Sequence, residues 1–116
     1  MDRKKELKLQ YKQMRPDMGL FIIRSQMNSK CYIEASQNLK GAMNSSQFKL
    51  EGNSHPNREL QKEWNEQGAE NFMIDILENL EYDKDESKSD YREDLVLLRM
   101  TWEEKLIEEN MEFYKK

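Results

Sequence analysis

The sequence has very few of the residues that build disulfide frameworks and zinc sites. Its 116 residues include one cysteine, Cys31, and one histidine, His55. A disulfide needs a second cysteine, and a structural zinc site of the Cys/His type needs four such ligands. The sequence therefore excludes an internal disulfide and an internal zinc site of the Cys/His type. Its cysteine usage agrees with a reducing compartment.

Long apolar runs are also missing. No run approaches the roughly 18 apolar residues that mark a membrane-spanning helix. The opening stretch, MDRKKELKLQYKQM, contains no apolar segment of the kind found in signal peptides. These absences predict a cytoplasmic protein that makes no membrane contact.

What the sequence does contain is an unusual amount of charge, unevenly placed. Charged and apolar residues each make up 36% of the chain, a balance typical of a polar but folded domain. Residues 1–64 carry 12 Lys and Arg against 7 Asp and Glu, whereas residues 65–116 carry 7 against 16. The basic half suits contacts with phosphates. The acidic half suits a basic partner or a solvated helical face.

The start of the sequence predicts a helix followed by a β-hairpin. Residues 2–14 form a weak amphipathic pattern that stops before a proline, and we expect residues 1–17 to be a helical arm preceding a domain at 18–116. Residues 20–24 and 30–34 are apolar and favour strands, and the polar residues between them suit a turn. The two segments are predicted to pair as antiparallel strands.

Two helices are predicted to follow the hairpin. Leu39 and Met43 stand four residues apart on a short first helix, which gives way to the turn-rich loop KLEGNSHPN at residues 49–57. The second helix is predicted to begin after Asn57, which favours the N-cap position. It should end near Gly68, because a helix C-terminus often needs a positive φ.

A third strand and a last helix complete the predicted fold. Apolar and polar side chains alternate over residues 71–78, as they do in a strand. After an acidic linker, Asp90 and Glu93 have the spacing of a capping box, and an apolar stripe continues to near residue 113. The predicted fold is α/β of the α+β kind, in the order α-ββ-α-α-β-α, with a small, mostly antiparallel sheet of three strands flanked by helices.

Two tripeptides in the predicted hairpin carry a family resemblance. Gly19-Leu20-Phe21 and Tyr32-Ile33-Glu34 resemble the paired tripeptides of the GIY-YIG nucleases, the second following the first by 13 residues. Downstream, the same register continues through Leu60-Gln61, Asn65, Gly68, Phe72 and Ile76-Leu77-Glu78. The resemblance covers about residues 18–106. A small domain of this family is typical of bacteria and their phages.

The resemblance implies a chemistry and the side chains that it requires. The family hydrolyses a DNA phosphodiester, with a first tyrosine that takes or relays the proton of the attacking water. An arginine and a second tyrosine stabilise the developing negative charge. A glutamate holds a divalent metal that stabilises the leaving oxygen. An active member therefore needs two tyrosines, an arginine and a glutamate in one cleft.

Carried over position by position, the resemblance leaves one of these four groups in place. The second tyrosine falls on Tyr32, but the first falls on Phe21, which has no hydroxyl to take or relay a proton. The arginine falls on Ala42. The metal-binding glutamate falls on Arg99 when Trp102 is taken as the matching tryptophan.

Three further positions bear on the predicted site. Glu34 replaces the glycine that closes the second tripeptide, and so adds a carboxylate where a phosphate would lie. A loop histidine found in part of the family falls on His55. Glu103 lies one helical turn beyond Arg99 and could hold Mg²⁺ if the metal site had moved along the helix.

The sequence therefore predicts a degenerate nuclease domain that acts as a non-catalytic nucleic-acid-binding or regulatory module. It is expected to need no cofactor, or Mg²⁺ if it is active. Tyr32 and His55 are the expected remnants of the catalytic site. The candidate contacts with nucleic acid are Lys30, Tyr32, Lys40, Lys49, His55 and Arg58. The alternatives are an active Mg²⁺-dependent DNA endonuclease with a rearranged site and a protein-interaction factor that acts through its acidic C-terminal half.

Several of these residues also have a purely structural interpretation. Tyr32 can pack with its hydroxyl at the sheet edge, and His55 can be a solvent-facing turn residue. Trp64 and Trp102 lie on apolar helix stripes, which favours core packing over stacking on bases. Cys31 stands between strand residues, which favours an inert buried thiol.

Overall fold

The computed structural model describes residues 15–115, and the predicted helix at residues 2–14 lies outside them. In chain order the elements are β1 (Met18–Ser25), β2 (Lys30–Ser36), α2 (Leu39–Glu51), α3 (Arg58–Gln67), the 3₁₀ turn η1 (Ala69–Asn71), β3 (Phe72–Leu80), α4 (Arg92–Glu108) and β4 (Glu112–Phe113). None of the described helices is long and apolar enough to cross a membrane.

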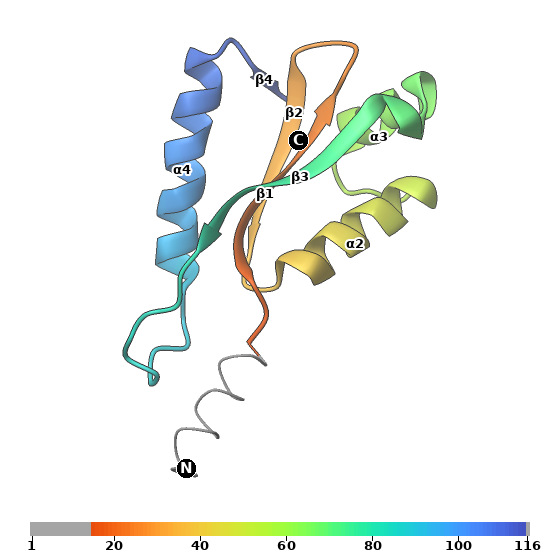
Figure 1. Cartoon of the computed structure of the whole chain (residues 1–116). Coiled ribbons are helices and arrows are strands. Elements are labelled where there is room, and N and C mark those ends of the chain that lie inside the picture. Colours follow the sequence, from red (N-terminus) through yellow and green to blue (C-terminus); the bar gives the residue numbers. More distant parts are fainter. Residues whose placement is uncertain (1–14, 116) are drawn as a thin grey trace.

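The centre of the molecule is a four-stranded sheet in the order β3-β1-β2-β4 (Figure 1). The predicted antiparallel hairpin is confirmed, with Phe21 opposite Glu34 and Ile23 opposite Tyr32. β3 pairs antiparallel with β1 and extends to Leu80, two residues beyond its predicted end. Because residues opposite each other in a sheet point to the same face, these four hairpin side chains share one face.

The structure has one strand more than the three predicted. The last helix ends at Glu108, short of the predicted end near residue 113, because Asn110 adopts a left-handed φ of 65° and turns the chain back. The backbone N–H of Glu112 then donates to the carbonyl of Ser29 across 2.8 Å, and β4 pairs parallel with β2. The sheet is therefore mixed, because its edge strand β4 is parallel to β2 whereas the other strand pairs are antiparallel.

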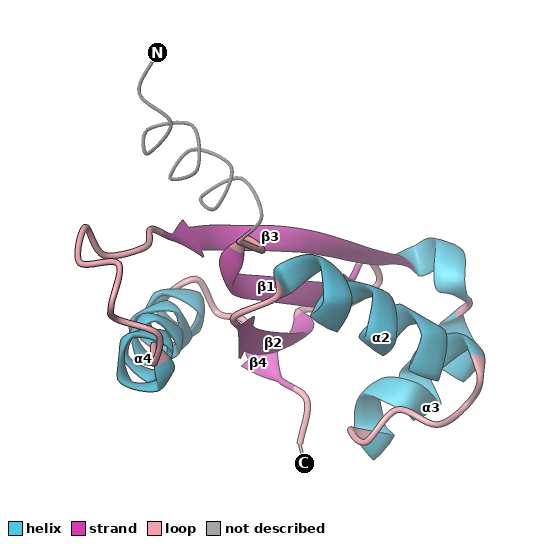
Figure 2. Ribbon diagram, turned by 90° about the horizontal axis from the view of Figure 1, so that it is seen from below, coloured by secondary structure: helices cyan, strands magenta, loops and turns pink. Residues whose placement is uncertain are grey.

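Helices cover both faces of the sheet, with α2 and α3 on one side and α4 on the other (Figure 2). Phe21 and Ile23 pack under α2 and α3 in a core that includes Trp64. Ile22 faces the other way and packs against Leu106 of α4. Alternate residues of β1 thus anchor the two helical layers, as expected for a strand covered on both faces.

The helix ends follow the predicted signals in one case and depart from them in another. The Asn57 side chain accepts a hydrogen bond from the backbone of Leu60 at 3.0 Å, and Gly68 ends α3 with a φ of 91°. Both predictions for this helix are confirmed. The predicted capping box of α4 is wrong, because the Asp90 carboxylate instead binds the Arg92 side chain at 2.8 Å. α2 continues through Glu51 and shortens the predicted loop.

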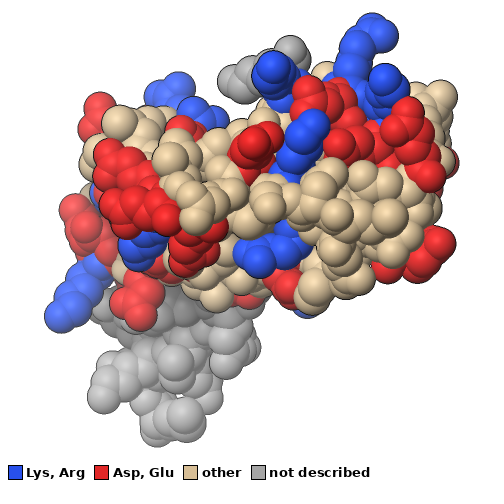
Figure 3. Space-filling view, turned by 90° about the horizontal axis from the view of Figure 1, so that it is seen from above, with Lys and Arg blue, Asp and Glu red and all other residues tan. Residues whose placement is uncertain are grey.

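Charge is distributed in patches over the surface. Seen from above, the molecule shows acidic side chains gathered in several places with basic side chains beside them (Figure 3). Lys88 pairs with Asp94 and Arg92 with Asp90, so part of the positive charge is neutralised locally. The basic first half of the sequence therefore does not become a uniformly basic face in this view.

Candidate functional site

Several of the positions that bear on the predicted site lie between the open edge of β2 and α4. One cavity, of about 310 Å³, is lined by Cys31, Tyr32, Ile33, Asn57, Arg99, Glu103, Phe113 and Tyr114. A second cavity, of about 460 Å³, shares Tyr32, Ile33 and Arg99 and adds Glu34. We call the two together the β2–α4 cleft. It brings together Tyr32, Glu34, Arg99 and Glu103.

The Tyr32 hydroxyl forms a hydrogen bond with a neighbour on its own strand. It donates a hydrogen bond to Oε1 of Glu34 at 2.5 Å. Burial raises the pKa of Tyr32, and the hydrogen bond to Glu34 raises it further. The tyrosine therefore keeps its proton, and the carboxylate that would repel a phosphate is held beside it.

The positions assigned to the first tyrosine and to the arginine lie in the core. Phe21 is fully buried under α2 and α3, and its ring lines neither cavity of the cleft. Ala42 is partly buried and packs against the same cluster. Neither side chain carries a polar atom, so neither can move a proton or stabilise a phosphate charge.

The two residues on α4 neutralise each other. Nε of Arg99 lies 3.2 Å from Oε1 of Glu103, one helical turn along. Mg²⁺ prefers several oxygen ligands in near-octahedral geometry. Between residues 15 and 115, no group of three or more His, Cys, Asp or Glu side chains is placed to hold a metal ion. The donor set of the cleft therefore does not fit the metal that the resemblance implies.

His55 is buried, so its interpretation as a solvent-facing turn residue is wrong. Its side chain is 5% exposed, and its ring stands edge-on to Tyr32 with the ring centroids 5.1 Å apart. Nδ1 accepts a hydrogen bond from the backbone N–H of Asn57 at 3.0 Å, which requires an unprotonated Nδ1. Burial lowers the pKa of His55, which favours the neutral ring.

The basic residues predicted to contact nucleic acid fall into two groups. Lys30 lies 3.1 Å from a carboxylate oxygen of Glu59 and 3.4 Å from one of Glu63, so its charge is largely compensated. Lys40, Lys49 and Arg58 are exposed, and no described carboxylate forms an ion pair with any of them. Among the predicted contacts, the uncompensated positive charge therefore lies on α2 and α3.

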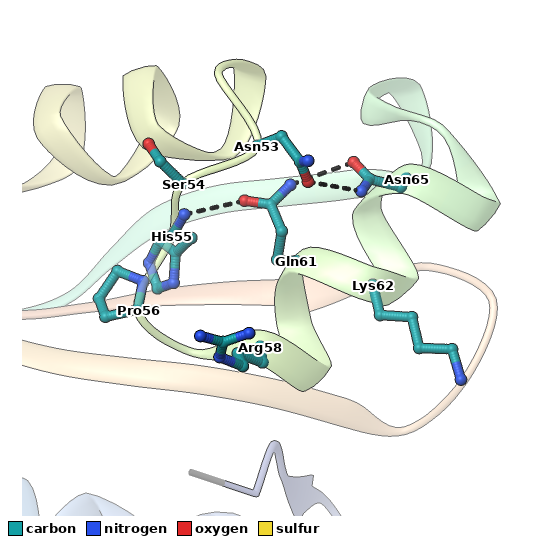
Figure 4. Close-up of a pocket in the computed structure, with 8 residues that line it drawn as sticks. All are labelled: Asn53, Ser54, His55, Pro56, Arg58, Gln61, Lys62 and Asn65. Atoms are coloured by element: carbon teal, nitrogen blue, oxygen red, sulfur yellow. Dashed lines mark hydrogen bonds between the residues drawn. The ribbon is translucent and has the colours of Figure 1, made fainter.

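A second hollow lies on the side of α3, and most of its residues were not predicted as site residues from the sequence. This cavity of about 510 Å³ is lined by Asn53, Ser54, His55, Pro56, Arg58, Gln61, Lys62 and Asn65 (Figure 4). We call it the α3 pocket. Arg58 and Lys62 are four residues apart on a predicted helix, which was a readable signal for two cations on one face. The loop that supplies Asn53 and Ser54 had no such signal.

Three other residues have the structural roles expected of them. Trp64 is buried against Phe72, with the ring centroids 5.3 Å apart. Nε1 of Trp102 donates to a carboxylate oxygen of Glu78 at 3.0 Å, and the ring packs partly buried beside the α4 core. Cys31 is fully buried, and burial raises the pKa of its thiol to about 11.

Comparisons with known proteins were made for sequence and for structure. No family model matches the sequence, and no curated protein is significantly similar to it. The structure is similar to the catalytic domain of the homing endonuclease I-TevI, with 22% identity, a TM-score of 0.65 and coverage of 85% of this chain and 99% of that one. A mutant of the same catalytic domain gives 21% identity, a TM-score of 0.62 and coverage of 78% and 84%. This likeness confirms the GIY-YIG-like fold that the two tripeptides predicted.

Proposed function

We propose that this protein is a non-catalytic nucleic-acid-binding module built on a GIY-YIG-like fold. The observation that carries the proposal is the internal pairing of the β2–α4 cleft, where Tyr32 is bound to Glu34 and Arg99 to Glu103. Losing one group that stabilises a transition state typically slows a reaction by about 10² to 10³. Here several required groups are replaced or engaged elsewhere, so hydrolysis is not expected.

Binding to nucleic acid is supported by the charge beside the cleft. Lys49, Arg58 and Lys62 are exposed on α2 and α3, and no described carboxylate pairs with them. The similar solved structure is the catalytic domain of an endonuclease. Because Glu34 places negative charge in the cleft, we expect a bound phosphate backbone to lie toward the α2 and α3 side.

The proposal is tested by fluorescence anisotropy of a labelled DNA duplex titrated with the protein. The titration contains Mg²⁺ and is run at about 50 and 200 mM salt, the range over which phosphate contacts weaken strongly. The DNA is then examined for nicks. We expect salt-sensitive binding and intact DNA. Absence of binding at the lower salt concentration, or nicking by the wild-type protein, would overturn the proposal.

A rearranged, active nuclease would need Glu103 as a metal ligand. This carboxylate forms an ion pair with Arg99. The Glu103 side chain is 40% exposed, so it is accessible to solvent although it is already paired. If the enzyme were active through this residue, Mg²⁺-dependent nicking by the wild-type protein would disappear in Glu103→Ala. Glu104→Ala, which changes a neighbouring exposed carboxylate, is the matched control. We expect neither the wild type nor either variant to nick DNA.

A protein-interaction role is a second candidate because α4 has an apolar outer face. Val96, Leu97, Met100 and Ile107 are 49%, 63%, 52% and 60% exposed, although the core already uses Leu95 and Leu106 of the same helix. Acidic residues flank them on this helix and just beyond it. A pull-down with the wild type is compared with a variant in which Glu103, Glu104, Glu108 and Glu109 are reversed to Lys. An unchanged set of retained proteins would count against this role.

A further inference from the structure

The α3 pocket is lined by positive and neutral side chains alone. Arg58 and Lys62 contribute the charge, and within residues 15–115 no Asp or Glu lines the pocket. In a sequence with 23 Asp and Glu against 19 Lys and Arg, such a pocket is a local exception. Its electrostatics favour an anion.

The floor of the pocket is held by a chain of side-chain hydrogen bonds. The buried Gln61 accepts from the backbone N–H of His55 at 3.0 Å and donates to Oδ1 of Asn65 at 3.1 Å. Asn65 in turn donates to Oδ1 of Asn53 at 2.8 Å (Figure 4). Gln61 also donates to the carbonyl of Leu50 at 3.0 Å, which fixes the floor to the end of α2.

This network leaves donors free at the rim. Asn53 accepts from Asn65 through its oxygen, and among the described residues no acceptor is recorded for its Nδ2 group. No carboxylate within the described part of the chain forms an ion pair with Arg58 or Lys62. A rim with two cations and an amide donor, above a fixed polar floor, has the chemistry of a phosphate site.

The spacing of the two cations indicates which phosphate compound fits. Arg58 and Lys62 are one helical turn apart, which places their Cβ atoms about 5–6 Å from each other. Figure 4 shows the Arg58 guanidinium close to His55 and Pro56, whereas the Lys62 side chain extends away from it. The cations therefore do not converge on one point. A strand that carries a negative charge every 3.4 Å or so along a duplex axis suits them better than one small anion.

We propose that the α3 pocket holds adjacent backbone phosphates of a bound nucleic-acid strand, with Arg58 and Lys62 contacting different phosphates and Asn53 donating between them. This inference rests on the proposed function, because it names the site at which the protein would bind the nucleic acid. It adds Asn53 and Lys62, which the sequence did not single out. It also places the contact outside the β2–α4 cleft, next to the buried His55.

The test compares two variants that remove the same amount of charge. Arg58→Gln combined with Lys62→Gln empties the pocket of cations, and Lys84→Gln combined with Lys105→Gln is the control on the loop before α4 and on α4 itself. All four side chains are exposed, so both proteins are expected to keep the wild-type thermal midpoint. Binding of the labelled DNA duplex is measured by anisotropy at several salt concentrations.

We expect the pocket variant to lose about tenfold in affinity at low salt and its salt-dependence slope to fall by about 2, one unit per lost phosphate contact. The control should stay within about twofold of wild type, since neither of its lysines lines the pocket. If the wild type binds DNA with a salt dependence that the pocket variant retains in full, the inference is wrong and the proposed function stands.

A second readout separates the two kinds of phosphate. His55 is the one histidine of the chain and lines the pocket, so its imidazole NMR signal reports on the site. Inorganic phosphate should move this signal weakly in the wild type and not at all in the pocket variant. If phosphate moves the signal but DNA does not bind the wild type, the pocket serves a free phosphate compound. That result overturns both the nucleic-acid ligand and the proposed function.

Discussion

The ring of His55 stands at 88° to the ring of Tyr32, in an edge-on contact that joins the loop before α3 to strand β2. This contact places the chain's one histidine between the β2–α4 cleft and the α3 pocket. The backbone N–H of His55 also donates to Gln61, and its ring Nδ1 accepts from the backbone N–H of Asn57. His55 is therefore fixed as part of the framework that positions both hollows.

The first prediction concerns acid stability. Because the pKa of His55 is lowered from 6.5 in the folded protein, the unfolded chain binds the proton more readily. Stability should therefore fall as the pH drops through about 6.5, and protonation would also break the bond that Nδ1 accepts from Asn57. Thermal midpoints are measured between about pH 7 and 5, above the usual range of carboxyl groups. His55→Gln should lack this component, and parallel profiles of the two proteins would contradict the prediction.

The second prediction concerns the Tyr32–Glu34 pair. Replacing Glu34 by Gln removes a negative charge that disfavours tyrosinate, so the pKa of Tyr32 should move down toward its ordinary value of 10. Burial remains, and the shift should therefore be partial. Ultraviolet absorbance of tyrosinate is followed on raising the pH, with Tyr32→Phe identifying the signal. An identical titration curve in Glu34→Gln would show that the carboxylate does not act on the hydroxyl.

The third prediction concerns repair of the cleft. Phe21→Tyr, Glu34→Gly, Ala42→Arg and Arg99→Glu together restore the residue types that the resemblance requires. We expect this variant to gain Mg²⁺-dependent nicking of DNA that the wild type lacks. A hydroxyl added at the fully buried Phe21 position destabilises the fold by about 1–3 kcal/mol if it finds no partner.

The repaired protein is therefore checked by circular dichroism and thermal unfolding before it is assayed. A version that also carries Tyr32→Phe is the matched control, because it keeps the repairs but loses the second tyrosine hydroxyl. A wild-type protein that cuts DNA as fast as the folded, repaired variant would contradict the interpretation of the cleft as non-catalytic.

The fourth prediction concerns Cys31. The folded state raises the pKa of this thiol from 9.0 to about 11, so near pH 8 the reactive thiolate is roughly a hundredfold rarer than in the unfolded chain. Burial against Leu106 of α4 slows access further. We expect alkylation of the native protein to be at least that much slower than alkylation in denaturant. Equal rates under the two conditions would show that the thiol is open to solvent.

Local signals predicted much of the fold. The antiparallel hairpin followed from its two apolar segments and the polar turn between them, and the ends of α3 followed from Asn57 and Gly68, because each signal lies within the element that it defines. α2 was predicted too short because its Asn44-Ser45-Ser46 run has weak helix propensity. The structure extends the helix through this run by burying Ser46 and Leu50, and such packing cannot be read from propensity.

The candidate site was predictable as a set of positions but not as a set of contacts. The resemblance located Tyr32, Glu34 and Arg99, helical spacing added Glu103, and the fold brings the four into one cleft. In the structure Tyr32 binds Glu34 and Arg99 binds Glu103. These contacts depend on side-chain geometry, which residue spacing does not reveal. The α3 pocket was harder to predict from the sequence, because its floor is formed by a loop, the end of α2 and one face of α3.

The short strand β4 has a consequence for how the protein is made. Its partner in the sheet lies at the start of β2, and Tyr114 just beyond it inserts into the same core as Phe21. These residues leave the ribosome long after the hairpin has been synthesised. While the three described helices emerge, the edge of β2 that pairs with β4 therefore stays unpaired, and the core position of Tyr114 stays unfilled. Completion of this domain is a late step in synthesis, and a nascent chain stalled before residue 112 would present that open edge to its surroundings.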